Sequence, residues 1–82
     1  MVLINVIFAE TNKEYDFKAD EQSSVEQVVE EMVAMIAEQE HSKVAKNSGL
    51  FLLCNPDTAQ IFSPMTTLTM NGVKSGLTLL LV

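Results

Sequence analysis

The chain has 82 residues, 48% of them hydrophobic, which gives room for a single domain (residues 1–82) and is too apolar for a disordered segment. The formal net charge is −6, and the five lysines are scattered with no arginine among them. Nucleic acid and anionic membrane surfaces are therefore poor candidates as partners, because both select for clustered positive charge.

Two strands are predicted at the start of the chain. Val2 to Phe8 is β-branched and apolar, which is typical of a buried strand, and Asn5 is its one polar residue. Lys13 to Ala19 alternates between aromatic and charged side chains, so the two segments predict a hairpin. The first run is too short for a transmembrane helix and lacks the basic flank of a signal peptide, so we expect no direct membrane insertion.

A single amphipathic helix is predicted from Ser23 to Glu40. Its apolar residues recur at steps of three and four and so share one face: Val25, Val28, Val29, Met32 and Ile36. Ser23 with Glu26 forms a capping-box pattern, and Ser24 with Gln27 offers the same pattern one residue later. A helix with one apolar face needs an apolar surface to cover, and the remaining segments supply the strands of that surface.

The remaining strands follow a polar exit from the helix, which contains His41 and ends in the turn cluster Asn47-Ser48-Gly49. The expected elements are a third strand, a short fourth strand, an irregular segment anchored by Leu68, and a last strand: Leu50–Cys54, Gln60–Phe62, Thr67–Ser75 and Leu77–Val82. We expect the last strand beside the first, with the helix as a right-handed crossover. The predicted fold class is α+β: a β-grasp domain with a mixed sheet of four to five strands and one helix packed on one face.

The closing stretch resembles the end of ubiquitin. It contains the leucine anchor Leu68, a Gly-Val turn at Gly72, a second glycine at Gly76 and an alternating final strand. Among ubiquitin-like proteins the chain is most similar to the small bacterial YukD/EsaB-like group, through Phe51–Asn55 and Ile61–Ser63. That group is encoded with type VII (WXG-protein) secretion systems. The resemblance implies a β-grasp fold and a cytoplasmic accessory or regulatory role in such a system.

The resemblance also bears on conjugation. Ubiquitin-like modifiers and sulfur carriers end in Gly-Gly, whereas this sequence ends Leu80-Leu81-Val82, inside the predicted last strand. The YukD-like group also lacks the pair, so we expect a non-catalytic protein-interaction module. The alternative is a sulfur carrier or protein modifier of the ubiquitin-like class, matured from a longer Gly-Gly precursor.

No residue pattern indicates catalysis, a metal site or a cofactor. His41 has no second ligand at metal-binding spacing, and Cys54 has no neighbouring base that could activate it. We therefore expect a solvated His41 and a packing role for Cys54. A lone cysteine forms no intramolecular disulfide, which fits a reducing cytoplasm. The helix glutamates Glu30, Glu31, Glu38 and Glu40 fall on its outer face, where solvated charge is usual.

One face of the predicted sheet is unusually apolar. One set of residues should face the helix: Ile4, Val6, Phe8, Phe51, Leu53, Leu77, Leu79 and Leu81. Alternation then puts a second apolar set on the opposite face: Leu3, Ile7, Leu52, Cys54, Leu80 and Val82. Scattered apolar residues are normal on a surface, whereas a contiguous patch usually marks an interface. We expect a contact centred on Leu3, Ile7, Leu52 and Leu80, either with a protein partner such as a secretion-system component or with a second copy in a homodimer.

Overall fold

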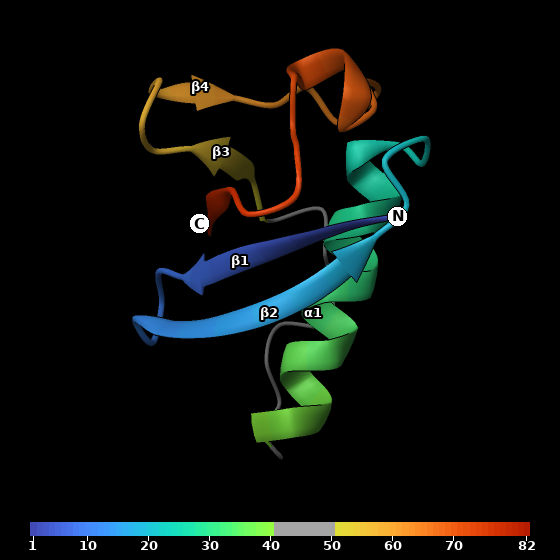
Figure 1. The fold of residues 1–82 in the computed structure, drawn as a ribbon. Helices are drawn as coiled ribbons and strands as arrows, with labels where there is room; N and C mark the ends of the chain where they lie inside the picture. The colour runs from blue at the N-terminus through green and yellow to red at the C-terminus, as the bar shows by residue number, and fades with distance from the viewer. Residues whose placement is uncertain (41–50) are drawn as a thin grey trace.

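A computed structural model describes residues 1–40 and 51–82 (Figure 1). Its elements, in chain order, are β1 (Val2–Phe8), β2 (Lys13–Ala19), α1 (Val25–Glu40), β3 (Leu53–Asn55), β4 (Gln60–Ile61), the 3-10 turn η2 (Thr69–Asn71) and β5 (Thr78–Leu81). The predictions made for His41, the Glu40 side chain, the Asn47-Ser48-Gly49 turn and Leu50 lie outside the described residues.

The strands of the described residues form one mixed sheet in the order β2-β1-β5-β3-β4. β1 and β2 form an antiparallel hairpin over their full lengths. β5 pairs with β1 in parallel, from Asn5 opposite Thr78 to Phe8 opposite Leu81. The first and last strands are therefore central neighbours, and α1 is the crossover that covers one face of the sheet (Figure 1). The predicted β-grasp arrangement is confirmed.

The start of α1 is fixed by its own cap and by a distant loop. Ser24 Oγ accepts a hydrogen bond from Gln27 N (3.2 Å), so the later of the two capping patterns is the one that forms. The first two helical amides have no partner within the helix. They donate instead to the carbonyl oxygens of Thr66 (2.7 Å) and Pro64 (3.1 Å). The segment that follows β4 therefore completes the helix N-terminus.

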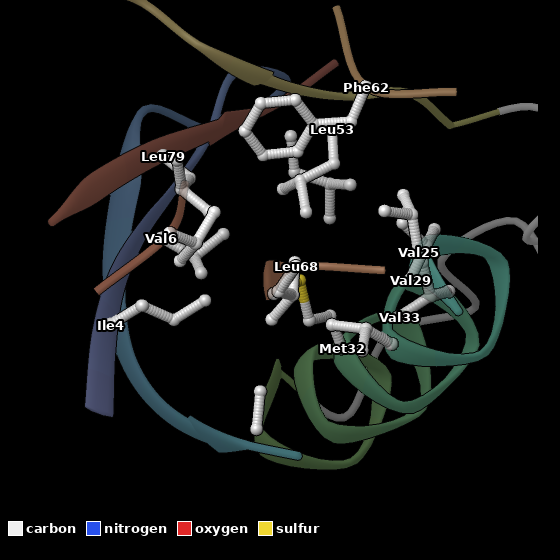
Figure 2. Packing of buried hydrophobic residues seen from close by; sticks show 14 of the residues in the cluster. Ile4, Val6, Val25, Val29, Met32, Val33, Leu53, Phe62, Leu68 and Leu79 are labelled. Carbon is white, nitrogen blue, oxygen red and sulfur yellow. The ribbon is translucent and has the colours of Figure 1, made fainter. Parts of the chain in front are cut away.

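The core lies between α1 and the sheet. In Figure 2, apolar side chains of α1 (Val25, Val29, Met32 and Val33) face Ile4, Val6 and Leu79 of the sheet, with Leu68 between the two layers. All five helix residues predicted for the apolar face are buried. The helix-facing set of the sheet is also confirmed, with Phe51 and Leu77 partly exposed but packed against the core. Each fully buried aliphatic side chain contributes about 1.5–3 kcal/mol of favourable burial, so this contact stabilises the packing of α1 on the sheet.

The connection between β4 and β5 is held by the side-chain amide of Asn71. Its Nδ2 donates to Thr66 Oγ1 (2.9 Å) and to the Thr67 carbonyl oxygen (2.7 Å), and its Oδ1 accepts from Gln60 Nε2 (3.1 Å). Leu68 is fully buried in the same segment, as its predicted anchoring role requires. The irregular segment therefore has a defined structure although it contains little regular secondary structure.

The strands on the β3 side of the sheet are shorter than the sequence predicts. β3 begins at Leu53, with Phe51 and Leu52 ahead of it, and β5 ends at Leu81. The ladder still continues one pair further, because Leu52 N donates to Val82 O (2.8 Å) and Val82 N donates to Leu52 O (2.9 Å). The predicted pairing is thus present beyond the formal strand ends.

Candidate protein-interaction face

The open face is the side of the sheet opposite α1. Burial alternates along β1 and β5, so residues between buried positions point away from the helix. Leu3 and Ile7 of β1, Leu80 of β5 and Leu52 next to β3 all lie on this face. Leu3 is 52% exposed and Leu52 44%, while Ile7 and Leu80 are half-buried. All four residues predicted to form a contact therefore share one surface.

Strand register brings three of these four residues together. Ile7 pairs with Leu80 across the β1–β5 ladder, and Leu80 pairs with Cys54 across the β5–β3 ladder. Leu52 lies opposite Val82, two residue pairs further along the same strands and so on the same face. Neighbouring strands are about 4.8 Å apart, so directly paired side chains on one face are in contact range. Ile7, Leu52 and Leu80 thus belong to one contiguous surface together with Cys54 and Val82.

Ile61 extends this surface to the edge of the sheet. It pairs with Cys54 across the β3–β4 ladder and is 63% exposed. The sequence prediction did not include it. In the structure Phe62 is buried, so the preceding residue points to the other face. We call the set Ile7, Leu52, Cys54, Ile61, Leu80 and Val82 the apolar patch.

Leu3 stands apart from the apolar patch. On the open face of β1, Asn5 lies between Leu3 and Ile7, and it pairs with Asp16 on one side and Thr78 on the other. Asn5 Nδ2 donates to Asp16 Oδ1 (3.4 Å), so a polar row crosses the face at this level. This polar row separates Leu3 from the other three residues of the predicted contact, and the contact itself stays a prediction.

Cys54 occupies the middle of the apolar patch as a packing residue. Its Sγ donates to the Leu80 carbonyl oxygen (3.5 Å), and burial raises the pKa of the thiol. A thiol attacks as its thiolate, so a raised pKa reduces the reactive fraction at neutral pH. The environment of Cys54 is thus the opposite of that of a nucleophilic cysteine.

The described part of the chain also bears on metal binding, on membrane spans and on the helix carboxylates. Within residues 1–40 and 51–82, no three His, Cys, Asp or Glu side chains are grouped so that they could hold a metal ion. No helix of these residues combines the length and apolar character needed to cross a membrane. Glu30, Glu31 and Glu38 are exposed to solvent on α1. A hollow of about 210 Å³ beside Val25 and Phe62 is lined mainly by apolar residues, and Leu52 borders this hollow as well as the open face.

Comparison with solved structures identifies the fold. The N-terminal ubiquitin-like domain of the 4931431F19Rik protein, determined in solution, matches with a TM-score of 0.70 and 20% identity, over 99% of this chain and 72% of that one. A de novo protein designed on the basis of ubiquitin matches with a TM-score of 0.67 and 17% identity, over 99% of this chain and 85% of the other. No protein-family model and no curated protein matches the sequence.

The fold is therefore ubiquitin-like: a β-grasp with a mixed five-stranded sheet and one helix on one face. Its most distinctive surface is the apolar patch on the open face, which reaches from β1 across β5 and β3 to the edge strand β4.

Proposed function

We propose that this chain is a non-catalytic protein-interaction module that acts in the bacterial cytoplasm as an accessory or regulatory component of a type VII secretion system. The observation that carries the interaction role is the apolar patch, because a contiguous apolar patch on the surface of a monomer is often functional. Support for the secretion role comes from the resemblance of Phe51–Asn55, Ile61–Ser63 and the closing segment to the YukD/EsaB-like group.

The acidic remainder of the surface is consistent with this role. A net charge of −6 keeps the free protein soluble while the patch stays available to a partner. Binding would remove Leu52 and Ile61, which are 44% and 63% exposed, from water. Removing apolar surface from water contributes roughly 25 cal/mol of favourable binding free energy for each Å².

The experiment uses the organism that encodes this chain. Deleting the gene is expected to reduce or misregulate secretion of WXG-type substrates, measured by immunoblotting of culture supernatants, and the wild-type gene should restore it. A Leu52→Asp, Leu80→Lys double variant is expected to be folded, as judged by its far-UV spectrum and melting curve, yet unable to restore secretion.

The matched control is a Met65→Asp, Met70→Lys double variant. Both methionines are large, apolar and exposed (80% and 72%), and the two substitutions change charge as the patch substitutions do. This control should restore secretion fully. A locus without a WXG-type substrate or its membrane ATPase, or a patch variant that restores secretion, would contradict the proposed role.

A further inference from the structure

A single row of side chains crosses the whole sheet on the open face. Strand pairings align Glu14 of β2 with Ile7 of β1, Ile7 with Leu80 of β5, Leu80 with Cys54 of β3, and Cys54 with Ile61 of β4. The row is therefore apolar over four neighbouring strands and ends in a carboxylate on the fifth. This asymmetry, with apolar residues along the row and an acid at one end, constrains what can bind there.

The spacing of the row matches an α-helix. Strands lie about 4.8 Å apart, so the three steps from Ile7 to Ile61 cover roughly 14 Å. A helix rises 5.4 Å per turn, so residues one turn apart meet neighbouring strands, and about three turns cover the row. An extended segment places its same-face side chains roughly 6.6 Å apart, out of step with the strands.

Charge at the row's end favours a basic partner. Glu14 is exposed at the end of the row, and Asp16, the next open-face residue of β2, is also exposed. A lysine or arginine located one turn beyond the apolar residues of a bound helix would reach these carboxylates. The net charge of −6 adds a long-range attraction for a basic segment.

A second copy of the chain fits this surface poorly. An exposed aliphatic side chain presents roughly 100 Å² of apolar surface, so the patch, with three residues 44–63% exposed and three half-buried, offers roughly 200 Å². A standard stable interface uses about 800 Å² from each partner. Within residues 1–40 and 51–82 the one α-helix does not offer a basic face either, because its outer face is acidic through Glu26, Glu30, Glu31 and Glu38.

We infer that the occupant of the apolar patch is a basic amphipathic α-helix of a partner protein, lying across the strands with its apolar stripe on the row from Ile7 to Ile61 and its cationic end at Glu14. This inference rests on the proposed interaction role of the open face and adds the chemistry of the partner. The contact area is small, so affinity in the micromolar range or weaker is expected.

The test is an NMR titration of the full nitrogen-15-labelled chain with a synthetic capped peptide of about 16 residues. The peptide carries leucine once per turn on one face, lysines in its last turn, and alanine and glutamine elsewhere. Chemical-shift changes are expected to concentrate on Ile7, Leu80, Cys54 and Ile61. A peptide of the same composition in shuffled order, which has no apolar stripe, should bind at least about tenfold more weakly.

Substitutions of exposed residues distinguish this binding mode from non-specific hydrophobic binding of the peptide. Ile61→Ser should weaken binding about tenfold, whereas Leu3→Ser, at an equally exposed residue of the same face outside the row, should leave it unchanged. Glu14→Lys should weaken binding about two- to fivefold, and less so at high salt. Glu30→Lys makes the same change in net charge on α1 and should have little effect.

Three outcomes would overturn the inference: equal binding of the two peptides, shift changes that lie off the row, or a dimer of the free chain in sedimentation that Ile61→Ser disrupts. The secretion assay distinguishes this failure from failure of the proposed function. If the Leu52→Asp, Leu80→Lys variant fails to restore secretion while the helical peptide does not bind, the open face is functional and its occupant is not a basic helix.

Discussion

Ala59 adopts a left-handed backbone conformation, with φ of 59°, in the turn between β3 and β4. This conformation costs a residue with a Cβ about 1–2 kcal/mol, and glycine avoids that cost. Glycine in turn loses more chain entropy on folding, about 0.5–1 kcal/mol. Ala59→Gly is therefore expected to raise the free energy of unfolding by up to about 1.5 kcal/mol, as measured by urea denaturation monitored by circular dichroism.

Asn12 provides the matched control, because it also has φ of 59° in a hairpin turn. Asparagine tolerates the left-handed region far better than alanine, so little strain is available for release there. Asn12→Gly is expected to leave stability unchanged or lower it slightly. Equal stabilisation by both substitutions would mean that strain is not specific to Ala59.

At the scale of elements, Asn71 ties the segment before β5 to β4. Asn71→Ala removes three hydrogen bonds and leaves the Gln60 amide and the Thr67 carbonyl without these partners. A loss of about 1–3 kcal/mol in the free energy of unfolding is expected, measured by thermal or urea unfolding. Asn55→Ala, which removes one turn hydrogen bond to the Asp57 amide, should cost clearly less. Equal losses would show that the Asn71 contacts are no more important than those of an exposed turn.

Most of this element structure could be predicted from the sequence. The bounds of β1 and β2 match, because β-branched runs and strict alternation are local signals. α1 begins at Val25, two residues after the predicted Ser23, because the Ser24 cap forms in place of the Ser23 one. The first two helical amides also donate to the carbonyl oxygens of Thr66 and Pro64, some forty residues away. A capping pattern read from sequence contains no information on such distant carbonyl groups.

For the candidate site, the sequence predicts which side of the sheet each residue occupies, but not which residues lie next to one another on that side. Alternation assigns Leu3, Ile7, Leu52 and Leu80 to one side of the sheet, and the structure confirms that assignment. Alternation does not say which residues pair across strands. Only the register shows that a polar row separates Leu3 from the patch and that Ile61 extends it.

At the scale of the whole molecule, the excess of negative charge opposes compaction. The chain has eleven acidic residues against five lysines, so the folded state concentrates like charge that the unfolded chain spreads apart. Raising the salt concentration from about 0.1 M to 1 M shortens the screening length from about 10 Å to 3 Å. The melting temperature is therefore expected to rise with added sodium chloride, as followed by differential scanning calorimetry.

A double variant, Glu30→Lys with Glu31→Lys, tests the cause of this salt response. Both residues are exposed on α1, and the substitutions raise the net charge by four units without altering the core. The rise in melting temperature with salt should be clearly smaller in this variant. An unchanged rise would assign the effect to general salting-out of apolar surface and not to charge repulsion.

The parallel pairing of β1 with β5 also determines how the domain bears mechanical load. Force applied at the start of β1 and the end of β5 pulls these adjacent strands in opposite directions along their common axis. The hydrogen bonds between them, including Asn5 N to Leu77 O (2.9 Å) and Ala9 N to Leu81 O (3.0 Å), are then sheared together and cannot be opened one after another. The hairpin of β1 and β2, pulled at its open end, would instead unzip pair by pair. A partner or translocating machine that pulls on the chain ends would thus meet the strongest resistance in the centre of the sheet.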